Sequence, residues 1–261
     1  GAAMILKEDF YYPPADSYRK LHIYLPDDYA SGNNTYPVMY FFDGHNLFFD
    51  QDATFGRSWR FLDYLHSWNK DLIFVGMECS HDGNARLYEY MPYPTNSKYL
   101  REAPCIGDAT LQWIVNDIKP FIDNRFPTIP NRQCTAIGGS SMGGLMAFYG
   151  ATAYNHVFSK AACVSSSFIF CPRTVLSALN HCNIDPDTRI YLSYGGQEVR
   201  GIKDPWAEDH SSYVYRCNKS VQNKLDRTGA ATMLYFQKGG RHCEEDWEKQ
   251  IPVFMPWLWQ A

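Results

Sequence analysis

The chain has 261 residues, of which 45% are hydrophobic and 20% charged, and its formal net charge is −4. A chain of this length can bury one large core, and α/β folds of this size are commonly a single domain, so we expect one domain over residues 1–261. The slight negative charge offers no general attraction to nucleic acid or to an anionic membrane. No apolar run approaches the roughly 18 residues of a spanning helix. We therefore expect neither kind of partner.

The N-terminus and the cysteines bear on the compartment. Residues 1–3 precede Met4 and resemble an expression remnant, and no basic-then-apolar secretory pattern follows them. The eight cysteines are spread singly along a chain that is large enough to fold without disulfides. Cys134 and Cys163 fall in apolar runs, where a free thiol behaves as a small hydrophobe. These features favour a reducing, cytoplasmic location.

The first part of the chain alternates between strand-like and helical patterns. Residues 10–12 and 18–25 favour β-structure, and such a pair is typical of antiparallel strands at a sheet edge. Residues 38–42 and 72–75 are continuously apolar, as strands covered on both faces are. Between them, large apolar residues recur every third position over 62–68, which indicates one face of a helix.

The middle of the chain contains a long segment with no clear period, residues 79–107, which is rich in tyrosine. An irregular segment of this length is usually a lid or a functional loop, and its aromatic residues could offer stacking surfaces to a substrate. The alternative is that these aromatics only cover the sheet. A strong helical stripe follows over 111–122, and Pro120 is expected to kink that helix.

The remaining chain repeats one unit, a strand followed by a helix. Apolar runs typical of strands and of helical faces occur at 134–137, 145–149, 161–164, 190–194, 214–225, 232–236 and 247–258. Strands that alternate with helices after an N-terminal antiparallel pair predict an α/β fold. Its sheet should be mostly parallel and covered by helices on both faces.

A single G-x-S-x-G match lies in the middle of the chain, at residues 139–143, and it places Ser141 at the nucleophile position. Reading Ser140 as the nucleophile would put Met142 where the second glycine belongs. The motif needs glycines because a strand must turn sharply into a helix, with the serine exposed at the apex. The strand-like run before the motif and the helical run after it fit that geometry, whereas a serine- and glycine-rich turn would need neither.

Two further side chains follow predicted strands, where the sites of open parallel sheets lie. Glu198 follows the strand at 190–194, and His242 follows the strand at 232–236. The order serine, carboxylate, histidine is that of α/β-hydrolases. A histidine can deprotonate the hydroxyl of Ser141, and a carboxylate fixes the imidazole tautomer and stabilises the imidazolium. We therefore predict that His242 is the base and Glu198 the acid.

An oxyanion intermediate also requires backbone N–H donors. Met142, immediately after the nucleophile, is expected to supply one, and His45, in the turn after the strand at 38–42, the other. His45 could contribute only through its backbone. Asp43 precedes the serine in the chain and is expected to shape that turn.

Other residues could take the acid and base roles. Asp204, Glu208 and Asp209 lie in the same connection as Glu198, and His210 follows it, but His210 precedes the last strand and therefore ranks below His242.

No nucleotide-binding or zincin motif is present in the sequence, so no cofactor is expected. Cys79 with His81, or His242 with Glu244 and Glu245, could be considered metal ligands. Their spacing matches no closed zinc set, so no metal is expected either.

The motifs together resemble the esterase family of α/β-hydrolases that includes esterase D, feruloyl and acetylxylan esterases, siderophore esterases and the antigen 85 mycolyltransferases. The matching segments span most of the chain: 41–46, 138–144, 195–198 and 239–242, followed by Trp247. The resemblance implies a triad of Ser141, His242 and Glu198, with oxyanion donors at His45 and Met142. Many members carry Asp as the acid, whereas this chain has Glu.

The resulting hypothesis is a serine carboxylic ester hydrolase that works through an acyl-enzyme on a small-molecule or oligosaccharide ester. Feruloyl or acetyl esters of plant carbohydrate are favoured by the family and by the aromatic segment at 79–107. A siderophore-ester or thioester hydrolase of the S-formylglutathione type would use the same groups. A non-catalytic binding protein on the same fold is the alternative from another class, although it would have no need for all three triad residues.

Overall fold

The computed structural model describes residues 4–201 and 204–260, so the supposed expression remnant at residues 1–3 lies outside the described residues. The strands all belong to one eight-stranded sheet with the order β1-β2-β4-β3-β5-β6-β7-β8. Their bounds are Met4–Tyr12 (β1), Ser17–Leu25 (β2), Val38–Phe42 (β3), Ile73–Met77 (β4), Thr135–Ser140 (β5), Lys160–Val164 (β6), Arg189–Gly195 (β7) and Ala231–Gln237 (β8).

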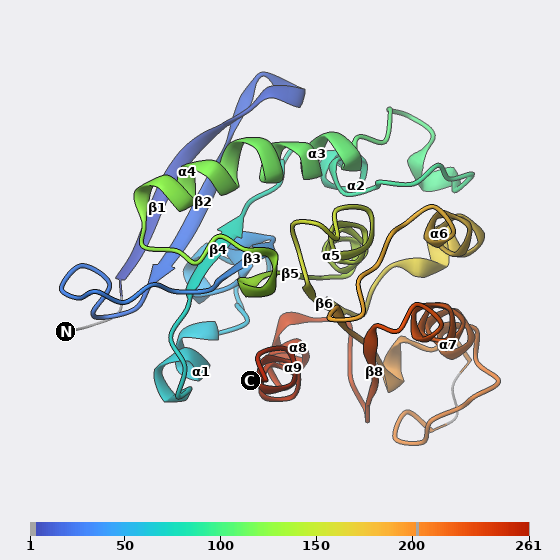
Figure 1. The fold of residues 1–261 in the computed structure, drawn as a ribbon. Coiled ribbons are helices and arrows are strands. Elements are labelled where there is room, and N and C mark those ends of the chain that lie inside the picture. The colour runs from blue at the N-terminus through green and yellow to red at the C-terminus, as the bar shows by residue number, and fades with distance from the viewer. Residues whose placement is uncertain (1–3, 202–203, 261) are drawn as a thin grey trace.

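The pairing of the strands divides the sheet into two parts. β1 is antiparallel to β2, and β2 is antiparallel to β4. Every pairing from β4 through β3, β5, β6 and β7 to β8 is parallel. The N-terminal hairpin stands at one side of the molecule and the strands with their connecting helices fill the rest (Figure 1). The prediction of a mostly parallel sheet with an N-terminal antiparallel pair is confirmed.

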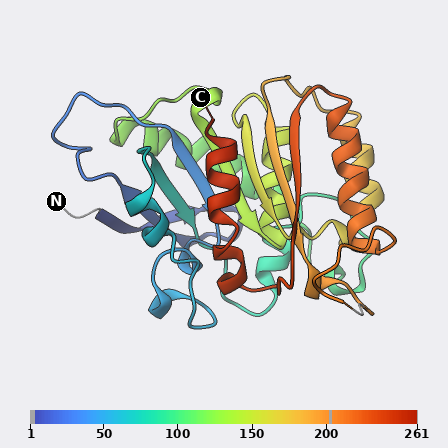
Figure 2. The same ribbon diagram turned by 90° about the horizontal axis from the view of Figure 1, so that it is seen from below.

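Helices cover both faces of the sheet, as predicted (Figure 2). Their bounds are Phe61–Ser67 (α1), Ala85–Glu89 (α2), Gly107–Trp113 (α3), Lys119–Arg125 (α4), Met142–Ala153 (α5), Pro172–Leu179 (α6), Tyr213–Asp226 (α7), Glu244–Glu248 (α8) and Ile251–Leu258 (α9). Buried residues of α1, α8 and α9 belong to one apolar cluster, and those of α3 to α7 belong to the other.

The strand β3 shows why its sequence is apolar at every position. Tyr40 and Phe42 contribute to one cluster, and Met39 and Phe41 contribute to the other. Successive side chains of a strand point to opposite faces, so a strand that is covered on both faces has no position for a polar residue.

Three helical regions differ from the sequence-based expectation. The helix α6 was not predicted. The stripe at 111–122 is interrupted by a π-helical turn, Ile114–Ile118, and Pro120 lies in the first turn of α4, where the missing N–H of a proline costs little. The predicted C-terminal helix is two helices, α8 and α9, which are separated at Lys249 and Gln250.

The aromatic residues of the 79–107 segment are mostly not available to a substrate. Tyr88, Tyr90 and Tyr93 are buried, whereas Tyr99 is 59% exposed. Tyr90 packs edge-on against Phe42, with ring centroids 5.0 Å apart. The expectation that this segment offers several stacking surfaces is therefore wrong. These rings are part of the core because a short helix, α2, turns the segment back onto the sheet.

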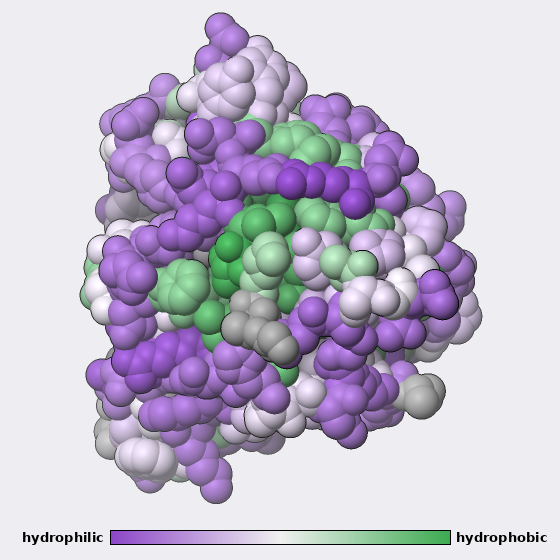
Figure 3. Space-filling view, turned by 90° about the vertical axis from the view of Figure 1, so that its left-hand side faces the viewer, coloured by the Kyte–Doolittle hydropathy of each residue, from purple (hydrophilic) through white to green (hydrophobic). Residues whose placement is uncertain are grey.

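The outer surface is mainly hydrophilic on the side of β1, with a patch of apolar residues in its middle (Figure 3). β1 is an edge strand, and the charged residues Lys7, Glu8 and Asp9 along it disfavour pairing with another chain. Among the described residues, none of the helices combines the length and the apolar character that crossing a bilayer requires. All eight cysteines have free thiols.

Candidate active site

Ser141 occupies the sharp turn between β5 and α5, with φ of 61° and ψ of −122°. A non-glycine residue rarely adopts this conformation, and such strain concentrates at functional sites. The two motif glycines permit it, because the strand and the helix touch: a Cβ added to Gly139 would lie 2.4 Å from the carbonyl oxygen of Gly143. The G-x-S-x-G spacing thus has the mechanical basis that the sequence indicated.

The structure brings Ser141, His242 and Glu198 together at the carboxyl ends of β5, β7 and β8. His242 Nε2 lies 3.0 Å from Ser141 Oγ, and His242 Nδ1 lies 2.5 Å from Glu198 Oε1. The distances suit a hydroxyl donating to Nε2 and a protonated Nδ1 donating to the carboxylate. His242 is half exposed, whereas the carboxylate of Glu198 is largely buried.

The loops that carry His242 and Glu198 are fastened to each other. Gln197 donates through its backbone N–H to Gly240 O and through its side-chain amide to Gly239 O. Gly195 allows this approach, because a Cβ there would lie 2.3 Å from the oxygen of Gly240. The acid and the base are therefore held as one unit on neighbouring strands.

The second oxygen of Glu198 has two donors. Its Oε2 accepts from the backbone N–H of Gly195 at 2.5 Å and from the hydroxyl of Ser165 at 3.0 Å. Ser165 in turn accepts from the indole N–H of Trp247 at 3.2 Å, and the Trp247 ring packs edge-on against His242. Sequence reasoning assigned no role to Ser165. The sequence feature that could have indicated this role is the run of three serines directly after β6, the strand next to β5.

The two predicted oxyanion donors lie in the first turns of helices. Met142 is the first residue of α5, and His45 is the second residue of a 3-10 helix, Gly44–Asn46, which follows β3. The first N–H groups of a helix have no acceptor within the helix, so these two are available to an anion.

Asp43 shapes the turn that carries His45. Its φ is 58°, and both of its carboxylate oxygens accept from the guanidinium of Arg86, at 2.9 and 2.7 Å. Burial by itself would raise the pKa of Asp43, but the Arg86 charge and hydrogen bonds outweigh burial and hold the pKa below 3.8. Asp43 is therefore an ionised structural residue, as the sequence indicated, and Arg86 is its unpredicted partner.

The alternative acids and the alternative base have other contacts. Asp204 accepts from the N–H of Trp206, Asp209 accepts from Ser211, and Glu208 accepts from the hydroxyl of Tyr194. His210 stacks on Tyr215. Among the described residues, the acceptor of the hydrogen bond from His242 Nδ1 is Glu198.

A cavity of about 810 Å³ opens at Ser141 and His242. Aromatic residues, Phe55 and Trp247, share its lining with Arg57, Arg86 and Arg241. A second cavity, of about 910 Å³, contains Glu198, Tyr99, Phe170 and Tyr213 in its wall. His45 and His81, in the wall of the first cavity, form with Glu78 a cluster that has the composition of a metal-ligand set.

Known proteins resemble this chain over nearly its full length. The Bacillus subtilis (strain 168) protein YbbA is 24% identical over 247 residues, which cover 92% of each chain. The structure of an IroE-like serine hydrolase from Shewanella oneidensis has a TM-score of 0.72 at 18% identity and covers 96% of this chain and 78% of its own. A ferulic acid esterase has a TM-score of 0.64 at 15% identity and covers 98% and 97%.

The similarity to these two solved structures shows the α/β-hydrolase fold. The family model described as "Putative esterase" matches residues 15–258. This chain belongs to that esterase family, which confirms the prediction of an esterase.

Proposed function

We propose that the protein hydrolyses carboxylic esters through an acyl-enzyme on Ser141. The observation that carries the proposal is the hydrogen-bonded line from Glu198 through His242 to Ser141. In this reaction His242 Nε2 accepts the hydroxyl proton as Ser141 Oγ attacks the ester carbonyl. The same proton then passes to the leaving alkoxide, and water attacks the acyl-enzyme by the reverse route.

The surrounding groups would stabilise the charges that develop during the reaction. The N–H groups of Met142 and His45 would stabilise the oxyanion, each contributing about 3 kcal/mol to lowering the barrier. Glu198, whose second oxygen is occupied by Gly195 and Ser165, would hold the imidazole in one orientation and stabilise the imidazolium.

For the substrate we propose a hydroxycinnamoyl ester of a carbohydrate, with acetyl esters second. Phe55, which is 83% exposed, lines the cavity that contains Ser141 and offers apolar surface to an aromatic acyl group. A cavity of about 810 Å³ suits a ligand of that size.

A panel of esters tests this proposal. p-Nitrophenyl ferulate, p-nitrophenyl acetate and p-nitrophenyl butyrate, which share one leaving group, are compared by kcat/KM with wild-type protein and with Ser141→Ala. We expect hydrolysis of all three by the wild type, with the highest kcat/KM for ferulate, and background rates for the variant. Hydrolysis that Ser141→Ala retains would contradict the mechanism, and a preference for the alkyl esters would contradict the substrate class.

A further inference from the structure

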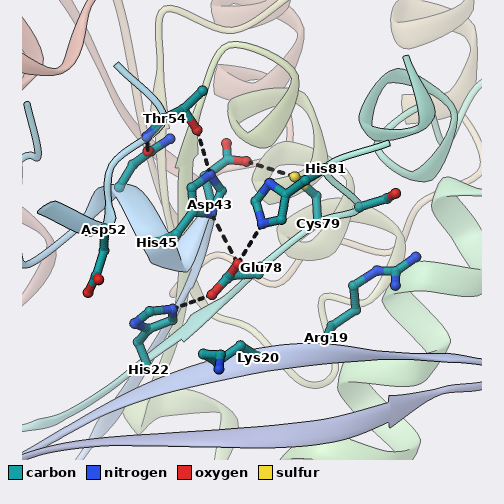
Figure 4. A network of polar contacts seen from close by, with 12 residues as sticks. Arg19, Lys20, His22, Asp43, His45, Asp52, Thr54, Glu78, Cys79 and His81 are labelled. Carbon is teal, nitrogen blue, oxygen red and sulfur yellow. Dashed lines mark hydrogen bonds and ion pairs between the residues drawn. The ribbon is translucent and has the colours of Figure 1, made fainter. Parts of the chain in front are cut away.

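Three histidines surround one glutamate at the end of β4, beside the active-site cavity. Glu78 Oε2 lies 2.6 Å from His22 Nε2, and Glu78 Oε1 lies 2.6 Å from His81 Nε2 and 3.9 Å from His45 Nδ1 (Figure 4). The donor atoms of His45, Glu78 and His81 all lie within 4.8 Å of one another. We propose that His45, Glu78 and His81 form a binding site for one divalent metal ion of the zinc class.

His45 provides the observation that distinguishes a ligand set from an ordinary ion-pair network. Its side chain is 7% exposed, and its Nδ1 is buried without a hydrogen-bond partner in residues 4–201 and 204–260. The separation of 3.9 Å from Glu78 Oε1 is too long for a hydrogen bond. Leaving a buried nitrogen without a hydrogen bond is unfavourable, and a metal ion would provide its missing partner.

The hydrogen bond at the other ring nitrogen, Nε2, is compatible with the tautomer in which Nδ1 can bind a metal ion. His45 Nε2 lies 3.0 Å from the hydroxyl of Thr54, a residue of the loop after β3. When Nε2 donates to Thr54, Nδ1 carries the lone pair, so two electron-rich atoms, Nδ1 and Glu78 Oε1, face each other. A hydrogen bond to the second ring nitrogen is typical of metal-bound histidines.

The carboxylate of Glu78 is held ready for the same role. Its Oε2 faces the imidazole of His22, and its Oε1 faces the imidazoles of His81 and His45. His22 is 2% exposed and orients the carboxylate through Oε2, which leaves Oε1 to the metal. Two imidazoles and a carboxylate are a known zinc-ligand set that leaves a fourth position for water or substrate.

The three ligand atoms would need to move only slightly to bind a metal ion. In a tetrahedral zinc site with bonds of about 2.0–2.2 Å, the ligand atoms are about 3.3 Å apart. The pair Glu78–His81 is shorter than this and the pair His45–Glu78 is longer. His81 is 56% exposed in the loop after β4, so it can move away from Glu78. His45 and His81 line the cavity that contains Ser141, so the fourth position is expected to face that cavity.

Neighbouring groups do not compete for the role. The thiol of Cys79, the residue after Glu78, donates to Asp43. Sequence analysis did not find the site because its ligands follow two different strands, with 32 and 2 residues between successive ligands, so they form no short motif.

Metal titration of folded protein tests the proposal without reference to activity. Protein that has been treated with a chelator is titrated with Zn²⁺ by calorimetry at pH 7.5, and Co²⁺ is used to report the ligands by its visible spectrum. We expect one equivalent of Zn²⁺, a tetrahedral Co²⁺ spectrum without a thiolate charge-transfer band, and a higher Tm with Zn²⁺. His81→Asn should weaken binding by at least about 100-fold.

Matched variants separate this site from the other histidines. His210→Asn removes an exposed histidine, and His242→Asn removes the base next to Ser141, and both should bind Zn²⁺ as the wild type does. Glu78→Gln should lose binding. If Glu78→Gln does not fold, His81→Asn still tests the site, because His81 lies in an exposed loop. The proposal is overturned if the wild type binds no Zn²⁺, if His81→Asn binds it unchanged, or if His242→Asn alone abolishes binding.

Discussion

Two groups of histidine and glutamate side chains border the same cavity, and they differ in what each imidazole faces. In the first group one imidazole lies between Glu198 and the hydroxyl of Ser141. In the second group Glu78 is shared by His22 and His81, and a third imidazole, His45, faces it at 3.9 Å. A carboxylate with one imidazole and a nearby hydroxyl suits proton transfer, whereas several imidazoles around one carboxylate suit the binding of a cation.

The hydrogen-bond partners of the two carboxylates, Glu198 and Glu78, also differ. The second oxygen of Glu198 accepts from a backbone N–H and a serine hydroxyl, which are neutral donors. Both oxygens of Glu78 are bonded to imidazoles. Within the described residues, His242 is therefore the one imidazole that is hydrogen-bonded to Glu198. A substitution can disturb either group without touching the other.

The largest expected effect comes from removing the hydroxyl that distinguishes the first group. Ser141→Ala should lower kcat/KM for p-nitrophenyl acetate by about 10⁶-fold, because no other group can form the acyl-enzyme. Ser177→Ala, an exposed serine of α6, is the control and should leave the rate unchanged. A residual rate in Ser141→Ala within tenfold of the wild type would move the nucleophile elsewhere.

Replacement of the acid should have the next largest effect. Glu198→Gln removes the charge that orients His242 and should lower kcat by about 10⁴-fold, with the fold unchanged by circular dichroism. Asp204→Asn and Asp209→Asn, whose carboxylates bond to their own loop, should remain within about threefold of the wild type. Full activity of Glu198→Gln would return the acid role to one of these two residues.

The Asp43–Arg86 ion pair lies beside the second group, since Asp43 precedes the turn of His45 and accepts from Cys79, the residue after Glu78. Arg86→Met leaves a buried carboxylate unpaired and should lower the free energy of unfolding by about 3–5 kcal/mol in urea at pH 7. Arg60→Met, which breaks the exposed pair with Asp50, should cost at most about 1 kcal/mol.

The same pair predicts a pH dependence. The pKa of Asp43 is lowered in the folded protein, so its contribution to stability is complete above the ordinary value of 3.8 and is lost as the pH falls through the lowered pKa. In Arg86→Met burial raises the pKa of Asp43, so the difference in stability between the two proteins should begin to narrow above pH 3.8 and continue to narrow as the pH falls through the lowered pKa of the wild type. A difference that stays constant to pH 2 would show that Asp43 does not depend on Arg86 for its charge.

A smaller effect is expected at Ser165, a positioning residue that acts through Glu198. Ser165→Ala removes a hydrogen bond to a charged oxygen, worth about 1.5–3 kcal/mol, and should lower kcat by about 10- to 100-fold with little change in KM. Ser166→Ala is the matched control, because the hydroxyl of Ser166 is buried without a partner in the described residues. Equal kcat values for the two variants would remove Ser165 from the account.

Much of this structure follows from local patterns in the sequence. The continuously apolar runs at β3 and β4 predicted buried parallel strands, and G-x-S-x-G predicted the turn at Ser141, because each pattern reflects the constraints on a single element. Glu198 and His242 could be proposed because the carboxyl ends of parallel strands meet at one edge of the sheet.

The unpredicted features depend on contacts between segments that are distant in the chain. Ser165 supports Glu198 only because β6 and β7 are neighbours, and the tyrosines of the 79–107 segment are buried because α2 turns them inward. The cluster around Glu78 needs the pairing of β2 with β4, which places His22 beside that strand. The spacing of residues along the sequence does not indicate which strands are neighbours in the sheet.

The most direct test of the central claim is covalent labelling of the folded wild-type protein with a fluorophosphonate, followed by mass spectrometry of the intact chain and its peptides. We predict one adduct per chain, located on Ser141, with labelling slowed strongly in His242→Asn and Glu198→Gln. Absence of an adduct on folded protein, or an adduct that persists at the same rate in Ser141→Ala, would contradict the account.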